Sequence, residues 1–345
     1  MDNAELAELD RRRRQAKKHP LTPGLVLSSR TPSLVPDVFP ARQAPSDDHP
    51  RRVVDWQLVE RLQEADQAFD LVLKEPLATG KSLWSQVWRA DVRIGDETHS
   101  IVLKLYMEAL FPPPLATVGR RWRRAEVNAL SEADSYTAFA PLQGFVVPMC
   151  YGFYRFDHLP AGESAIGVLL EDLSPVSSTL PAWLAEQRRL KRRQRRRQQL
   201  DARGNVPDSS GADSSDVDST AEEELFEFEQ IEPLICSIFD NFRELHRCNR
   251  ATFAPYASDF LIAGLDPAQA EVITLGFSAT QSKQEWEAED TAACERVRRK
   301  HNRSEDKSDW RRADTYALEG ELGHHAFGLD LMDRWEQKWA KHYRA

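Results

Sequence analysis

Two neighbouring stretches, Trp84-Ser-Gln-Val-Trp-Arg-Ala-Asp-Val92 and Ser100-Ile-Val-Leu-Lys-Leu-Tyr106, decide the fold. In the first, apolar and polar residues alternate, which is typical of a strand with one buried face. The turn Ile94-Gly-Asp-Glu-Thr-His99 separates it from the second stretch, and the apolar run 68–74 precedes both. Strands joined by short turns predict an antiparallel meander of three strands.

The segments that follow the meander predict one helix, further strands and then a mainly helical half. The predicted elements are, in order, helix 118–139, strands 144–148, 150–154 and 165–170, helices 180–197 and 228–245, and strands 260–262 and 272–275. Helical spacing of apolar residues identifies the helices, and short apolar runs between turn residues identify the strands. The pattern therefore predicts an α+β protein.

Composition and charge restrict the classes of protein that fit. The 345 residues carry a formal net charge of −9, which argues against a nucleic-acid footprint spread over the whole chain. Four scattered cysteines without a CxxC pair fit a reducing compartment. No signal peptide and no apolar run of about 18 residues is found, so we expect no membrane span. The expected location is the cytoplasm, with the nucleus as an alternative.

Short motifs give the chain a resemblance to the protein-kinase superfamily, and in particular to small fungal proteins that contain a protein-kinase domain. Val102-Leu-Lys104 resembles the V-A-I-K of the third kinase strand, and Gly80 to Val87 resembles the glycine-rich loop, with serines at its other two glycine positions. Glu132-Ala-Asp-Ser-Tyr136, followed by Leu142-Gln-Gly144 and Val147-Pro148, resembles a pattern of the fungal proteins. Ile166 to Leu173 is similar to the strand and hinge that hold adenine.

The resemblance implies a fold, a ligand and a set of site residues. It implies a bilobal α+β fold, with a disordered tail over 1–52, an antiparallel-sheet N-lobe and hinge over 53–173, and a shortened helical C-lobe over 174–345. A charged, disordered insert is expected at about 188–224. The ligand would be ATP, and Glu132 would be the partner of Lys104. The residues expected to contact the nucleotide are Gly80, Ser82, Val87, Lys104, Glu132 and Glu171.

The catalytic positions of the family are altered in this chain. When 246–262 is aligned with the family's catalytic loop, Ala254 stands at the catalytic aspartate and Asp259 at the metal-binding asparagine. The stretch 272–278 resembles the kinase motif that ends in Asp-Phe-Gly, and Gly276 stands at the position of its aspartate, which binds magnesium in the family. Alanine and glycine have no side-chain oxygen, so only Asp259 is left as a metal ligand, and magnesium binding is expected to be weak. The resemblance therefore implies no confident catalytic residue.

Three functions remain open from the sequence. The first is a pseudokinase that binds nucleotide, a protein partner or both, with little phosphotransfer. The second is an active atypical kinase in which Asp259 or another carboxylate binds the metal ion or acts as the catalytic base. Enzymatic activity therefore stays undecided. The third is a protein that binds nucleic acid through the basic run Arg188–Arg197. Partner, substrate and pathway are not specified by any of these motifs.

Overall fold

The computed structural model describes residues 3–41, 52–64, 67–80, 83–113, 122–157, 159–160, 162–174, 176–204, 260–264, 270–275 and 280–282, and scattered positions between 233 and 252. By its internal contacts the chain divides into two compact units. The first contains residues 1–175, 242–253 and 275–304, and the second contains 176–241, 254–274 and 305–345. Lys104 and Glu132 both belong to the first unit.

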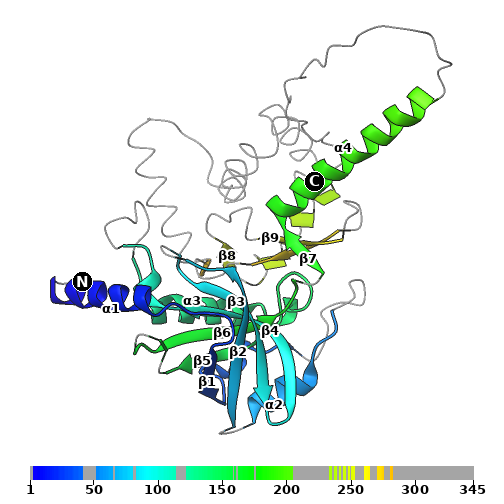
Figure 1. The fold of residues 1–345 in the computed structure, drawn as a ribbon. Helices are drawn as coiled ribbons and strands as arrows, with labels where there is room; N and C mark the ends of the chain where they lie inside the picture. Colours follow the sequence, from blue (N-terminus) through cyan, green and yellow to red (C-terminus); the bar gives the residue numbers. More distant parts are fainter. Residues whose placement is uncertain are drawn as a thin grey trace, which may run out of the picture. The chain divides into compact units, whose positions relative to one another are not determined.

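A six-stranded antiparallel sheet forms the centre of the first unit (Figure 1). Its strands are β1 (Val26–Arg30), β2 (Ala68–Ala78), β3 (Gln86–Ile94), β4 (Glu97–Tyr106), β5 (Cys150–Phe156) and β6 (Ala165–Glu171), in the order β1-β2-β3-β4-β6-β5. β2, β3 and β4 pair as consecutive antiparallel neighbours, so the predicted meander is confirmed. A two-residue turn joins β3 to β4, and Gly95 takes there a positive φ of 61° that other residues adopt only with strain.

The two edges of this sheet approach each other, so that one sheet face is enclosed. The Ser29 hydroxyl of β1 donates to the Arg155 carbonyl of β5 at 2.6 Å, and the Phe153 amide donates to the Ser33 hydroxyl at 2.8 Å. The enclosed face holds the fully buried side chains of β4, including Leu103 and Leu105. Gly167 on β6 leaves room for them, because a Cβ there would lie 2.8 Å from a Leu103 methyl carbon.

In the described part of the first unit, the helices α1 (Asn3–Lys18), α2 (Trp56–Gln63) and α3 (Ala125–Ala138) accompany the sheet. Asp55 caps α2 by accepting a hydrogen bond from the Leu58 amide. α3 confirms the helix predicted between 118 and 139, although residues 114–121 lie outside the described part of the chain. The segment 144–148, predicted as a strand, is instead a tight turn in which the Gly144 amide donates to the Val147 carbonyl.

The prediction of a disordered tail over residues 1–52 is wrong for most of its length. Residues 3–18 form α1, residues 26–30 form β1 and pair with β2, and a 3-10 turn, η1, covers Pro36–Val38. Leu9, Leu27 and Val38 are buried. The segment is rich in proline and charge, but these three apolar side chains are removed from water in the folded protein.

The second unit combines a small sheet with a long helix. β7 (Ser177–Thr179), β9 (Phe260–Ala263) and β10 (Glu271–Thr274) pair antiparallel in the order β10-β9-β7. β9 and β10 confirm the strands predicted at 260–262 and 272–275.

The helix α4 of the second unit spans Leu180–Gly204. The expected disorder at 188–224 is therefore wrong for 188–204, while 205–224 lies outside the described residues. Arginine, lysine and glutamine are good helix formers, which accounts for the extended helix. β8 (Arg250–Thr252) and β11 (Thr280–Ser282), which are distant in sequence, pair as a two-stranded antiparallel sheet that belongs to the first unit.

Gln143 joins three separate segments in the interior of the first unit. Its side chain is fully buried; Nε2 donates to the Val38 carbonyl at 2.7 Å and to the Tyr136 carbonyl at 3.2 Å, and Oε1 accepts from the Cys150 amide at 2.8 Å. One amide group thus ties the N-terminal segment, the end of α3 and the start of β5 together. The Leu-Gln-Gly run at 142–144 is therefore a structural motif of this fold.

Replacing Gln143 by leucine should destabilise the protein by about 2–4 kcal/mol, because three backbone groups lose their partner in a buried place. Urea denaturation followed by circular dichroism measures this change. Gln63→Leu, at an exposed position at the end of α2, is the matched control and should change stability by less than about 0.5 kcal/mol. Equal losses in the two variants would contradict the structural role of Gln143.

Candidate functional site

An ion pair between β4 and α3 is the centre of the candidate site. Lys104 Nζ lies 2.6 Å from Glu132 Oε2, and the two side chains are 11% and 1% exposed. The pairing that the resemblance implied is thus present in the structure. Because an ion taken out of water is costly unless it is paired, a carboxylate at 1% exposure depends on donors held in place around it.

Tyr106 is a second donor to the same carboxylate, and the sequence did not reveal it. Its hydroxyl donates to Glu132 Oε2, and its ring centroid lies 5.6 Å from Lys104 Nζ. Tyr106 follows Lys104 by two residues on β4, so both side chains lie on one face of the sheet. The spacing of two residues between Lys104 and Tyr106 was the sequence signal that could have predicted this contact. Many buried strands, however, carry a tyrosine without such a contact.

Apolar side chains surround Lys104 on its face of the sheet. Val87 on β3 and Val168 on β6 are its direct cross-strand neighbours, and Val168 is fully buried. Val102, two residues earlier on β4, has Leu170 of β6 as its neighbour on the same face. Arg89 of β3 is the other cross-strand neighbour of Val102 on this face, and its guanidinium pairs with Glu75 at 2.7 Å and with Asp172 at 3.3 Å. The part of the face next to Lys104 therefore presents valine side chains beside the Lys104 ammonium, which suits a flat apolar ring that carries an anionic group.

Gly80 lies at the end of β2, in the turn that leads to β3. Its φ of 142° is open to glycine but strained for other residues. The Gln86 side chain binds this turn twice: Oε1 accepts from the Gly80 amide at 2.8 Å, and Nε2 donates to the Gly80 carbonyl at 2.9 Å. The Gly80 amide is thus already bonded within the protein, and Ser82 lies outside the described residues.

The Glu171 side chain is directed away from Lys104. Glu171 is three residues beyond Val168 on β6, so the alternation of the strand places it on the other face. There its carboxylate pairs with Arg52 at 3.0 Å and accepts from the Met149 amide at 3.1 Å. The Glu171 amide donates to the Met149 carbonyl. The structure therefore uses this residue to hold residues 52 and 149, and does not bring it to the ion pair.

The positions that correspond to catalytic residues, Ala254, Asp259 and Gly276, lie outside the described residues. Within the part of the chain that the structure describes, no group of three or more His, Cys, Asp or Glu side chains is arranged to hold a metal ion. None of the described helices is both long and apolar enough to cross a membrane.

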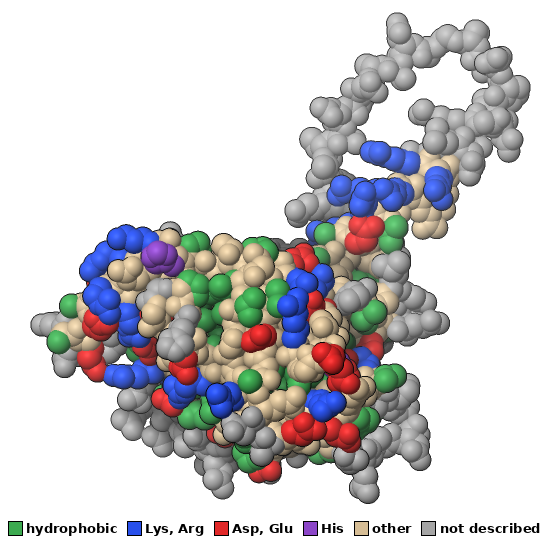
Figure 2. All heavy atoms as spheres, turned by 60° about the horizontal axis from the view of Figure 1, so that its bottom comes forward, with side chains coloured by type: hydrophobic (Ala, Val, Ile, Leu, Met, Phe, Trp, Pro, Cys, Tyr) green, Lys and Arg blue, Asp and Glu red, His purple; other side chains and the backbone are tan. Residues whose placement is uncertain are grey.

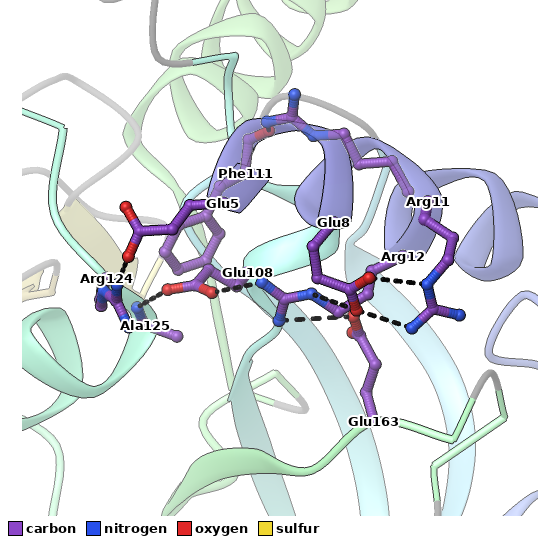
Figure 3. Close-up of polar contacts among 10 residues, drawn as sticks. Glu5, Glu8, Arg11, Arg12, Glu108, Phe111, Arg124, Ala125 and Glu163 are labelled. Carbon is purple, nitrogen blue, oxygen red and sulfur yellow. Dashed lines mark hydrogen bonds and ion pairs between the residues drawn. The ribbon is translucent and has the colours of Figure 1, made fainter. Parts of the chain in front are cut away.

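The N-terminus of α3 is held by contacts with α1 and with the turn η2 (Glu108–Leu110) (Figure 3). Glu108 Oε1 accepts from the Ala125 amide at 3.2 Å, and its Oε2 pairs with Arg12 of α1 at 3.0 Å. Arg124, the residue before the helix, pairs with Glu5 of α1 at 2.5 Å. Glu108 thus caps α3 from a distant part of the chain, since Arg124 makes no side-chain cap of its own.

Glu163 lies beside the same network, in surroundings that disfavour the charged form of its carboxyl group. Its carboxylate is 3.8 Å from Arg12, and its Oε1 has no hydrogen-bond partner. Burial raises the pKa of Glu163, and the charges of Glu108 and Glu8 raise it further, while Arg12 and Arg11 oppose the shift. The folded protein therefore holds a proton on this carboxyl more tightly than the unfolded chain does.

No protein-family model matches the chain, and a search of curated proteins found no relative.

Replacing Glu108 by alanine should lower the free energy of unfolding by about 1–2 kcal/mol, because α3 loses its cap and Arg12 loses its partner. Urea denaturation measures this loss. Glu126→Ala removes the same charge from the exposed first turn of α3 and is the matched control. A loss in the control as large as that in Glu108→Ala would contradict the capping role.

Replacing Glu163 by glutamine should have a pH-dependent effect. A carboxyl whose pKa is raised by folding contributes stability below the unfolded value, and this contribution is lost as pH rises through the folded value. The variant should therefore gain stability relative to the natural protein as pH rises from about 4 to about 8. Thermal unfolding at a series of pH values measures the difference, and a constant difference would contradict the prediction.

Proposed function

We propose that the chain is a pseudokinase: a kinase-like domain that binds ATP at the Lys104–Glu132 pair and transfers phosphate poorly or not at all. The observation that carries this proposal is the buried ion pair between a strand lysine and a helix glutamate. In protein kinases, the corresponding pair between the third strand and the following helix must be in place for the nucleotide phosphates to be held.

The local arrangement around the pair supports the proposal. β4 is the third strand of the meander β2-β3-β4, and α3, which supplies Glu132, is the next α-helix in the described part of the chain. Gly80 lies in the turn between the first two of these strands, as a phosphate-covering loop requires. Val87, Val102 and Val168 give the apolar surroundings that an adenine ring needs.

The poor phosphotransfer follows from the sequence of the second half. Ala254 and Gly276 stand where the family has the catalytic base and the magnesium-binding aspartate, and neither side chain has an oxygen. Asp259 alone supplies a carboxylate, and one carboxylate does not fill both roles. Because this chemistry depends on positioning and on neutralising the phosphate charges, the loss of both groups lowers the rate by orders of magnitude.

Thermal unfolding with and without ATP and magnesium tests the nucleotide site. At an ATP concentration of about ten times Kd, the unfolding midpoint should rise by about 3–5 °C, because ATP binds only the folded state. Lys104→Met should abolish this rise. Lys74→Met, which removes an exposed lysine of β2, is the matched control and should keep it.

Two further measurements make the result decisive. Circular dichroism must show that Lys104→Met is folded, because removing one partner of a buried ion pair costs about 3–5 kcal/mol. Isothermal titration calorimetry then gives ATP affinity directly. No heat of binding to the natural chain would overturn the proposed nucleotide site, and rapid ATP turnover would overturn the pseudokinase assignment in favour of an active kinase.

A further inference from the structure

The basic half of α4 belongs to the second unit, whereas Lys104 and Glu132 belong to the first. Its first turns are anchored: Leu180, Trp183 and Leu184 are buried, and Trp183 Nε1 donates to the Gly264 carbonyl at 2.8 Å. Beyond Gln187 the helix carries eight Lys and Arg residues between 188 and 197. Figure 2 shows the basic side chains gathered along this helix.

Like charges repel one another along the basic half of this helix. Arg189 pairs with Glu186 at 3.4 Å, but no acidic residue stands between 187 and 198. Pairs of like charge four residues apart, such as Arg192 with Arg196 and Arg193 with Arg197, each destabilise a helix by about 0.2–0.5 kcal/mol. A polyanion bound along the helix would relieve all of these repulsions at once.

The distribution of charge around the helix indicates which kind of polyanion fits it. At 3.6 residues per turn, the basic side chains occupy roughly two thirds of the helix circumference. The remaining stripe contains Leu190 and Gln194 and continues the anchored face of Trp183. A flat anionic membrane would meet only part of such an arc, and a helix that lies on a membrane needs a broad apolar face, which Leu190 alone does not provide.

A groove with phosphates on both sides matches this arc. The major groove of B-DNA is about 12 Å wide and admits an α-helix of about 10–12 Å diameter, so that side chains on opposite flanks reach both phosphate strands. The major groove of A-form RNA is too narrow for a helix. Single strands are bound through aromatic stacking, and the segment 187–198 has no aromatic residue.

We propose that the basic half of α4 binds duplex DNA in the major groove, without sequence preference, through the phosphate backbone. The inference is independent of the nucleotide site in the first unit. Its binding is electrostatic, so it releases counterions and weakens steeply as salt increases. A second polyanion is present in the chain itself, since the segment 208–224 has seven Asp and Glu residues.

Fluorescence anisotropy of a labelled duplex DNA of mixed sequence, titrated with the full chain at several salt concentrations, tests this proposal. A triple variant, Arg192→Gln, Arg193→Gln and Arg196→Gln, keeps good helix formers and removes charge from the centre of the arc. The slope of log affinity against log salt should fall in magnitude by about 2–3. The matched control, Arg14→Gln, Lys17→Gln and Lys18→Gln, removes three exposed charges from α1 and should leave the slope unchanged.

Each other outcome would overturn the proposal. No binding of the natural chain at about 100 mM salt would mean that the charge of α4 is neutralised within the chain. Equal slopes for the α4 variant and the α1 control would place the binding elsewhere. Equal affinity for an RNA duplex of the same sequence would contradict the groove geometry. Equal affinity for vesicles containing phosphatidylserine would identify a membrane surface as the partner.

Discussion

A single carboxylate oxygen, Oε2 of Glu132, joins the helix α3 to the strand β4. The Lys104 ammonium and the Tyr106 hydroxyl both donate to it, and the carboxylate is almost completely shielded from water. The ion pair and its burial depend on each other: without the donors the carboxylate could not stay buried, and without the carboxylate the lysine would lack a partner. The position of α3 therefore controls the candidate site. Contacts that hold the start of this helix, such as Glu108 with the Ala125 amide, act on the site from one end of the helix.

Polar residues of the N-terminal segment explain why its structure was not foreseen. Ser29 and Ser33 bind backbone groups of β5, and the Val38 carbonyl accepts a bond from Gln143. Serine and proline in a charged segment are also the usual signals of disorder. An ordered segment differs from a disordered one only in its contacts with residues that are distant in sequence, and a local sequence pattern does not show those contacts. Burial of Leu9 and Leu27 completes a set of contacts that a sequence window of ten or fifteen residues cannot show.

Much of the sheet and the central pair could be predicted, because strands with one buried face alternate and because motifs keep their spacing. β2, β3, β4, β6 and α3 all lie close to their expected positions. The role of Glu171 could not be predicted in the same way. Its distance from Lys104 depends on the register of β6 against β4, in which Lys104 faces Val168. Glu171 is three positions, an odd number, beyond Val168, so the alternation of the strand directs the Glu171 side chain to Arg52 on the opposite face.

The Gln86 side chain bears on how tightly a nucleotide can bind. In kinases the loop over the phosphates uses free backbone amides, whereas the Gly80 amide is already bonded to Gln86 Oε1. A phosphate would first have to replace this bond, at a net cost of about 0.5–1.5 kcal/mol. Since 1.4 kcal/mol corresponds to a tenfold change in affinity, this bond between Gly80 and Gln86 alone would lower the affinity for ATP by up to about tenfold. The same bond keeps the turn ordered without ligand, so that under the proposed function the site would be formed before ATP binds, at the expense of affinity. Such a balance would suit the proposed pseudokinase better than an enzyme that turns nucleotide over.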